Sequence, residues 1–145
     1  WPSILLARAA TADAATDIEA AEAACAWTAW RQAAGTLSSE QVIKLVRNSG
    51  LRGRGGSGYP TGDKWAACAA ERGRTRHVVA NGFEADPGAQ ADRTLMETDP
   101  HAVVEGVALA AWAVRAEDAI IAVYARATAA IERLRGAIEA AEAKG

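Results

Sequence analysis

The chain has 145 residues, half of them hydrophobic, which is enough to bury the core of one domain. Its formal net charge of −2 argues against a nucleic-acid-binding protein that relies on overall basicity and against bulk attraction to anionic membranes. No apolar stretch approaches the roughly 18 residues of a membrane-spanning helix and no signal peptide is recognisable, so we predict a cytoplasmic protein without a direct membrane span.

Helices dominate the predicted secondary structure and alternate with two short apolar strands. A Ser38-x-x-Gln41 capping box with the hydrophobic staple of Leu37 and Val42 begins one helix, and an Asp99-Pro100 pair begins another. Such alternation predicts an α/β fold with short buried strands layered against helices. In chain order we expect helices over 16–34, 39–48 and 60–73, a strand over 77–80, a short helix near 93–97, a helix over 100–114, a strand over 119–124, and a final helix with Ile131, Leu134 and Ile138 on its buried face.

The cysteine and histidine content predicts no metal site. Cys25 and Cys68 are far apart in the sequence and have no ligand spacing, so two buried thiols are the preferred interpretation. Two cysteines cannot by themselves hold an iron–sulfur cluster, which typically takes four. His77 and His101 have no ligand-like neighbours, and we expect both to be structural.

The distribution of charge points to an anion-binding segment. Eight basic residues and only two acidic ones lie between Lys44 and Arg76. The same segment contains the spacing Gly53-x-Gly55-x-x-Gly58, whose glycines allow a tight turn and a close approach of backbone amides to a phosphate. We therefore expect the segment to attract a local anion.

Two common nucleotide-binding motifs do not fit this glycine-rich stretch. The dinucleotide fingerprint should follow a strand, whereas here it follows a capped helix, and a P-loop needs Ser or Thr where Trp65 follows Lys64. What remains is a run of amides, Arg52 and Arg54, a helix N-terminus and Lys64, which together would suit a phosphate. A glycine-rich linker made soluble by its arginines stays open as the alternative.

The string Ser49-Gly-Leu-Arg-Gly-Arg-Gly-Gly-Ser-Gly-Tyr-Pro-Thr-Gly-Asp-Lys-Trp65 resembles the FMN-binding loop of the flavoprotein subunit of NADH:quinone oxidoreductase, respiratory complex I. Flavoproteins of NAD-linked hydrogenases and formate dehydrogenases share this loop. The resemblance continues through Asn81-Gly-Phe-Glu-Ala-Asp-Pro-Gly88 and covers roughly residues 30–144. It implies the FMN-binding α/β domain of that family.

The resemblance also implies roles for single residues. The family's loop and lysine hold the FMN phosphate, its aromatic after the loop stacks on NADH, and its asparagine and acids lie near the flavin ring and the nicotinamide. Three residues also have plain structural alternatives: Tyr59 as a packing residue at a helix start, Asn81 as a turn former and Glu84 as a solvated turn acid. Trp65 is expected to be a packing anchor. The predicted cofactor-binding residues are Gly53, Arg54, Gly55, Gly56, Lys64, Asn81 and Tyr59, and the predicted catalytic residues are Glu84 and Asp86.

Three departures from the family pattern imply lost contacts to the flavin and to NADH. Phe83 replaces an acid, the aromatic expected after Trp65 is absent at Ala67, and the Arg-Gly-Glu-Tyr pattern is not kept around Arg126. The resemblance further implies an N-terminal helical lead over 1–36 and the first part of an FMN-binding domain over 37–145. The ubiquitin-like and iron–sulfur domains of the family are absent from this sequence.

The first functional hypothesis is an FMN-binding electron-input module of an NADH dehydrogenase-type oxidoreductase. It would accept hydride from NADH and pass electrons to iron–sulfur clusters in a partner subunit or another domain, in the cytoplasm or at the periphery of a membrane complex. The second hypothesis is a non-catalytic interaction or assembly module that retains the phosphate loop, and Phe83 favours it. A third is an anion-binding domain for another nucleotide.

Overall fold

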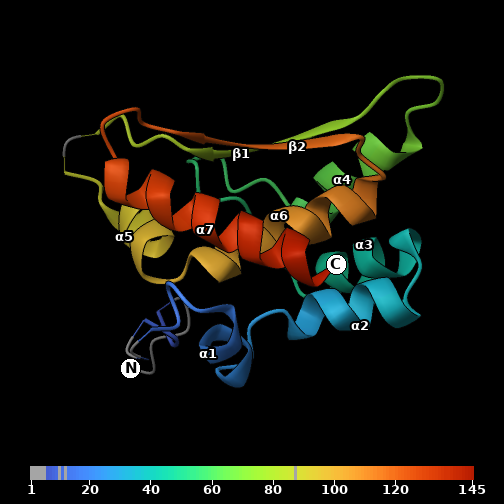
Figure 1. The fold of residues 1–145 in the computed structure, drawn as a ribbon. Coiled ribbons are helices and arrows are strands. Elements are labelled where there is room, and N and C mark those ends of the chain that lie inside the picture. The colour runs from blue at the N-terminus through green and yellow to red at the C-terminus, as the bar shows by residue number, and fades with distance from the viewer. Residues whose placement is uncertain (1–5, 10, 12, 87) are drawn as a thin grey trace. The chain divides into compact units, whose positions relative to one another are not determined.

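The computed structural model describes residues 6–9, 11, 13–86 and 88–145, and the predicted α/β fold is confirmed. Among these residues the structure has seven helices and two strands (Figure 1). They are α1 (Ile18–Ala23), α2 (Thr28–Thr36), α3 (Ser39–Asn48), α4 (Thr61–Ala70), β1 (His77–Gly82), α5 (Ala91–Thr98), α6 (Pro100–Val114), β2 (Asp118–Val123) and α7 (Thr128–Lys144).

The chain forms two compact units, and the strands and α6 each run from one unit into the other. Unit 1 comprises residues 1–28, 80–106 and 121–145, and unit 2 comprises residues 29–79 and 107–120. The glycine-rich loop belongs to unit 2, whereas Asn81, Glu84 and Asp86 belong to unit 1. The predicted boundary after residue 36 stays a prediction.

The sheet consists of β1 and β2, which pair in parallel. The backbone N–H of Glu117 donates to the C=O of Arg76 (2.9 Å) just before the two strands begin. The prediction that both strands are buried is wrong in part, because Val79 and Ile120 are 62% and 54% exposed. A sheet of two strands can be covered on one face and open on the other, and these apolar side chains lie on a face that no described residue covers.

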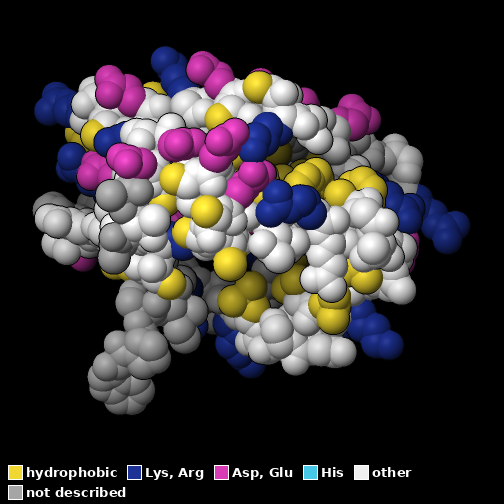
Figure 2. All heavy atoms as spheres, turned by 60° about the horizontal axis from the view of Figure 1, so that its bottom comes forward, with side chains coloured by type: hydrophobic (Ala, Val, Ile, Leu, Met, Phe, Trp, Pro, Cys, Tyr) yellow, Lys and Arg dark blue, Asp and Glu magenta, His cyan; other side chains and the backbone are white. Residues whose placement is uncertain are grey.

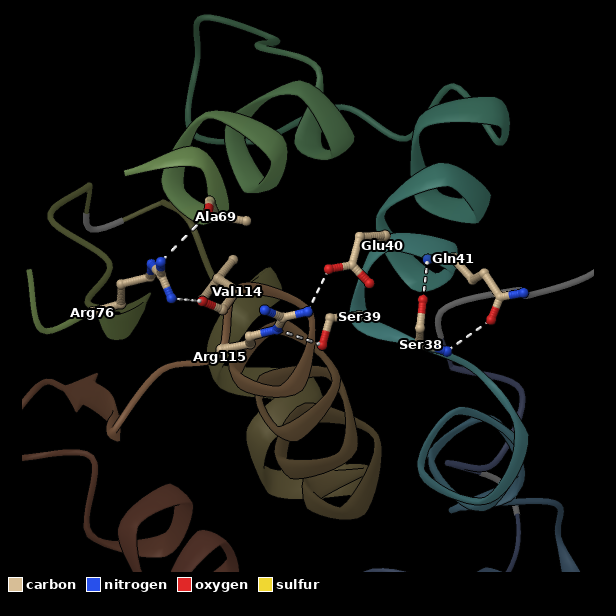
Figure 3. Close-up of polar contacts among 8 residues, drawn as sticks. All are labelled: Ser38, Ser39, Glu40, Gln41, Ala69, Arg76, Val114 and Arg115. Carbon is tan, nitrogen blue, oxygen red and sulfur yellow. Dashed lines mark hydrogen bonds and ion pairs between the residues drawn. The ribbon is translucent and has the colours of Figure 1, made fainter. Parts of the chain in front are cut away.

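In unit 2 a small core forms where α3 packs against α4. Its buried members are Ala33, Val42, Ile43 and Ala113, and Trp65 packs against them as the predicted anchor. The predicted capping box is present at the start of α3: the Ser38 hydroxyl accepts from the N–H of Gln41, whose side chain accepts from the N–H of Ser38 (Figure 3).

Two arginines of unit 2 connect helix ends (Figure 3). Arg76 donates to the C=O of Val114 at the end of α6 (3.3 Å) and to the C=O of Ala69 near the end of α4 (3.4 Å). Arg115, which follows α6, pairs with Glu40 in the first turn of α3. Guanidinium groups near C-terminal carbonyls and a carboxylate near an N-terminus both complement the helix dipole.

Unit 1 has a second core between α5 and α7, built from Met96, Ala127, Ala130 and Leu134. The predicted single helix over 16–34 is wrong, because it is divided into α1 and α2. Between them Cys25 and Trp27 have positive φ angles of 69° and 62°, a conformation that an α-helix cannot contain.

A buried polar network holds Trp27 in this conformation. Its backbone N–H donates to a carboxylate oxygen of Glu105 (2.9 Å), and its indole N–H donates to Nδ1 of His101 (3.3 Å). Burial lowers the pKa of His101, and the charge of nearby Asp99 opposes that effect in part. The neutral ring can accept this hydrogen bond, so the predicted structural role of His101 is confirmed.

Two further expectations can be compared with the structure. Cys25 is exposed and Cys68 is half-buried, so the prediction of two buried thiols is wrong for Cys25, although both thiols are free. No helix in the described part of the chain is long and apolar enough to cross a membrane.

On the face drawn in Figure 2, hydrophobic side chains form small groups between charged ones.

Candidate functional site

The glycine-rich segment of unit 2 is a closed loop between α3 and α4. The N–H of Gly53 donates to the C=O of Tyr59 (2.9 Å), and the N–H of Thr61 donates to the C=O of Leu51 (2.9 Å). These bonds bring the two ends of the loop together directly before the first turn of α4. The segment is therefore a loop of fixed ends and not an extended linker.

Arg52 takes part in the closure of the loop. Its guanidinium donates to the C=O of Gly58 (2.8 Å). The sequence suggested Arg52 as one of the cations that would face a phosphate. In the structure its guanidinium instead donates a hydrogen bond to a carbonyl of the loop itself. Gly56 and Gly58 have φ angles of 117° and 61°, which explains why these two positions are glycine.

The tip of the loop exposes a run of unpaired backbone donors. The N–H groups from Arg54 to Gly58 donate to no other residue that the structure describes, and the tip is open to solvent. Successive backbone amides bind an anion where they point to one side of the chain. The loop therefore has donors that fit a phosphate.

Two exposed cations accompany these amides. Arg54 lies in the loop and Lys64 in the first turn of α4, and neither forms an ion pair with another described residue. The start of α4 has no side-chain cap, because its N-cap residue is Pro60. Asp63, the acid of the first turn, pairs with Arg47 (2.6 Å), which reduces its repulsion of an incoming anion.

The close packing of α3 on α4 fixes where the loop begins and ends. A side-chain carbon at Gly62 would lie 2.5 Å from the backbone nitrogen and Cα of Arg47. Only glycine permits this approach. The side chain of Tyr59, by contrast, is 50% exposed at the end of the loop.

In unit 1 the predicted acidic residues follow the carboxyl end of β1. The side-chain oxygen of Asn81 accepts from the N–H of Phe83 (3.1 Å). Oε1 of Glu84 accepts from the N–H of Asp92 in the first turn of α5 (2.7 Å). Each residue thus makes a local hydrogen bond, and Glu84 is more than a solvated turn acid because it caps a helix.

Asp86 shapes the next turn. Its Oδ1 accepts from the N–H of Gly88 (2.9 Å), and its C=O accepts from the N–H of Ala89 (3.0 Å). Pro87, which the sequence places in this turn, lies outside the described residues. Asp86 and Glu84 each keep a second carboxylate oxygen that bonds to no described residue.

A cavity of about 160 Å³ brings these two acids together with residues that the sequence did not single out. Arg93 lines the cavity and pairs with Glu97 (2.8 Å), and the hydrogen bond with Glu97 raises the pKa of Arg93. The position of Tyr124 directly after β2 was the available signal, because ligands bind beyond the carboxyl ends of parallel strands. The cavity is lined by residues that include Gly82, Glu84, Asp86, Arg93, Met96 and Tyr124.

Phe83 packs against Tyr124 with the two rings nearly perpendicular, at 84°, and 5.5 Å between their centres. Both side chains remain about half exposed, at 48% and 44%.

The described residues contain no group of three or more His, Cys, Asp or Glu side chains that could hold a metal ion. His77 instead pairs with Asp118 (3.2 Å).

The chain matches a family model described as the Nuo51 FMN-binding domain over residues 46–145. An NADH-quinone oxidoreductase subunit of Rhizobium meliloti is 39% identical over 124 residues, which cover 86% of this chain and 30% of that protein. The NADP-reducing hydrogenase subunit HndC of Solidesulfovibrio fructosivorans is 40% identical over 110 residues, covering 76% and 22%. An NADH-quinone oxidoreductase subunit of Aquifex aeolicus is 40% identical over 109 residues, covering 75% and 25%.

The chain thus spans less than a third of the length of these relatives. The family match begins inside α3 and includes the whole glycine-rich loop, both strands and α7. The chain therefore belongs to the family of Nuo51 FMN-binding domains.

Proposed function

We propose that the chain is the FMN-binding electron-input module of an NADH dehydrogenase-type oxidoreductase. It would act with iron–sulfur clusters in a partner subunit or another domain, in the cytoplasm or at the periphery of a membrane complex. The observation that carries the proposal is the closed loop with five successive unpaired amides between Arg54 and Gly58. The relatives named as NADH-quinone oxidoreductase and hydrogenase subunits support the same class of reaction.

In this proposal the FMN phosphate binds to the tip of the loop. Gly55 and Gly56 offer amide donors, and Arg54 and Lys64 offer positive charge. Gly53 acts differently, because its N–H is already bonded to the C=O of Tyr59 and therefore closes the loop. Charge-assisted hydrogen bonds of this kind are among the strong ones in proteins.

The residues of unit 1 would serve the reacting substrate. FMN, when bound, would supply the chemistry of hydride acceptance and one-electron release. Glu84 and Asp86 hold carboxylate oxygens in fixed positions through their backbone hydrogen bonds, and Asn81 is fixed in the same way. We propose that these groups orient NADH by accepting hydrogen bonds from it, and that Tyr59 stacks on it.

Lys64 provides the direct test. A single ammonium group facing a phosphate should contribute about 1.5–3 kcal/mol, so Lys64→Ala should weaken FMN binding at least about tenfold. Titration of the full chain with FMN, followed by quenching of flavin fluorescence, measures this loss. Lys44→Ala is the matched control, because Lys44 is an exposed lysine of α3 without an ion pair among the described residues.

The outcomes separate the proposal from its alternative. Equal FMN affinities of the Lys64→Ala variant and the unaltered chain would place the phosphate elsewhere. Bleaching of bound FMN by NADH supports electron input, whereas a flavin that stays yellow in excess NADH supports an assembly module that has kept the loop. The packing of Phe83 on Tyr124, in place of a free acid, is the observation that keeps this second candidate in view.

A further inference from the structure

An ion pair between Arg47 and Asp63 joins the two helices that the glycine-rich loop connects. Arg47 lies in the last turn of α3 and Asp63 in the first turn of α4. Nε of Arg47 lies 2.6 Å from Oδ1 of Asp63. The two backbones also meet here, since a side-chain carbon at Gly62 would lie 2.5 Å from the backbone nitrogen of Arg47. The helix contact therefore fixes the backbone positions from which the two side chains reach each other.

Asp63 places a negative charge beside a loop that is expected to bind an anion. It is the one acidic residue between Ser49 and Trp65. The start of α4 is the positive end of a helix dipole, which favours a phosphate and a carboxylate alike. Without a partner, Asp63 would compete with an incoming phosphate for this helix end and would offset the charge of adjacent Lys64.

Arg47 offsets the charge of Asp63 without using a cation of the loop. Arg54 and Lys64 keep their charges for a ligand, because neither is in an ion pair with another described residue. The side chains of the pair are 55% and 44% exposed, so their charges act on a ligand partly through water. In water, a unit charge about 10 Å from a phosphate dianion changes its affinity by about threefold at low salt.

We propose that Arg47 is a positioning residue, which sets the anion affinity of the loop through Asp63 and does not touch the ligand. Its guanidinium holds the carboxylate of Asp63 toward α3 and cancels its charge. The inference rests on the proposed function in one respect, namely that the phosphate of the ligand binds at the tip of the loop. It adds to that function a residue of α3 that lies outside the loop.

The test breaks the same ion pair from each side and measures FMN affinity by quenching of flavin fluorescence at low salt, with the full chain. Arg47→Gln leaves the negative charge of Asp63 without a partner, so FMN should bind about threefold more weakly. Asp63→Asn removes that charge and leaves Arg47 positive, so FMN should bind about threefold more tightly. The double variant, in which both charges are gone, should bind FMN as the unaltered chain does.

The opposite signs separate this effect from a structural one. Both single variants lose the same ion pair, so a pair that only braced the two helices would weaken FMN binding in both. Riboflavin, which has the flavin ring but no phosphate, should bind equally to all variants. The shifts with FMN should also disappear at about 1 M salt, where screening acts within about 3 Å.

Arg115→Gln is the matched control variant. Arg115 also forms an exposed ion pair in unit 2, with Glu40 in the first turn of α3. Glu40 and Arg47 lie at opposite ends of this helix, about 10 Å apart along its axis. Breaking the Arg115 pair should therefore leave FMN affinity unchanged.

Three results would overturn the inference: shifts of the same sign in Arg47→Gln and Asp63→Asn, no shift in either, or equal shifts with riboflavin. If FMN binds with the Lys64 dependence described above and one of these results is found, only this inference fails. If FMN does not bind, the proposed function fails, and the variants are then compared with inorganic phosphate by ³¹P NMR. Opposite shifts in phosphate affinity support the inference, whereas absence of phosphate binding overturns it too.

Discussion

Gly62→Ala perturbs the contact between α3 and α4, the two helices that the glycine-rich loop connects. Gly62 is buried in the first turn of α4, and the added methyl carbon would lie 2.5 Å from two backbone atoms of Arg47 and 2.7 Å from its Cβ. Ordinary contact between such atoms needs about 3.5–4.0 Å. Because the obstacle is largely backbone, α3 and α4 must separate by on the order of 1 Å.

Two opposing effects determine the size of the change. Overpacking of a well-packed contact typically costs about 1–3 kcal/mol, and a shift of backbone belongs at the upper end of that range. Replacing glycine by alanine inside a helix by itself stabilises the folded state by about 0.8–1.0 kcal/mol, because alanine has the higher helix propensity. We expect Gly62→Ala to lower the free energy of unfolding by about 2 kcal/mol, and to weaken FMN binding because the ends of the loop move with the helices.

Urea unfolding followed by tryptophan fluorescence measures the first effect, and the FMN titration measures the second. Gly136→Ala is the matched control, because Gly136 lies in α7 with nothing within 4 Å of the added carbon. The same substitution there should raise the free energy of unfolding by about 0.5–1 kcal/mol. A Gly62→Ala variant as stable as the unaltered chain, with unchanged FMN affinity, would refute the reasoning.

The remaining predictions concern one buried ring and one helix-end arginine. Burial lowers the pKa of His101, so the unfolded chain binds the proton more readily than the folded chain. The contribution of His101 to the free energy of unfolding should therefore be constant above the unfolded pKa of about 6.5. Below that pH the free energy of unfolding should fall by up to about 1.4 kcal/mol per pH unit. The test compares the urea midpoints of the unaltered chain and of His101→Gln between pH 7.5 and pH 5.5. The same change of midpoint with pH in both proteins would contradict the prediction. Arg76→Ala should lower stability by about 1–3 kcal/mol, because three backbone carbonyls lose a donor, and partial recovery in Arg76→Lys, measured by urea unfolding, would support that cause.

Much of the secondary structure could be read from local signals. The capping box at Ser38 begins α3 where it was expected, and the Asp99-Pro100 pair begins α6. The strands were also found, with ends shifted by one or two residues. These signals are local because a cap or a helix-breaking residue acts on backbone groups within one turn.

The break between α1 and α2 could not be predicted in the same way. The sequence over 16–34 is rich in alanine and contains no glycine or proline, so its local preference is helical throughout. Glu105, far away in sequence, accepts the N–H of Trp27 and stabilises the left-handed conformation there. A long-range hydrogen bond in a buried site overrides a weak local propensity.

The sequence by itself determined the family, the position of the glycine-rich loop and the order of the elements, because each depends on a continuous string of residues. Only the tertiary structure decided that Arg52 closes the loop, that Glu84 caps α5, and that Tyr124 shares a cavity with the acids after β1. These relations join residues that are up to about forty positions apart, and which of them meet depends on how the strands pair and the helices pack.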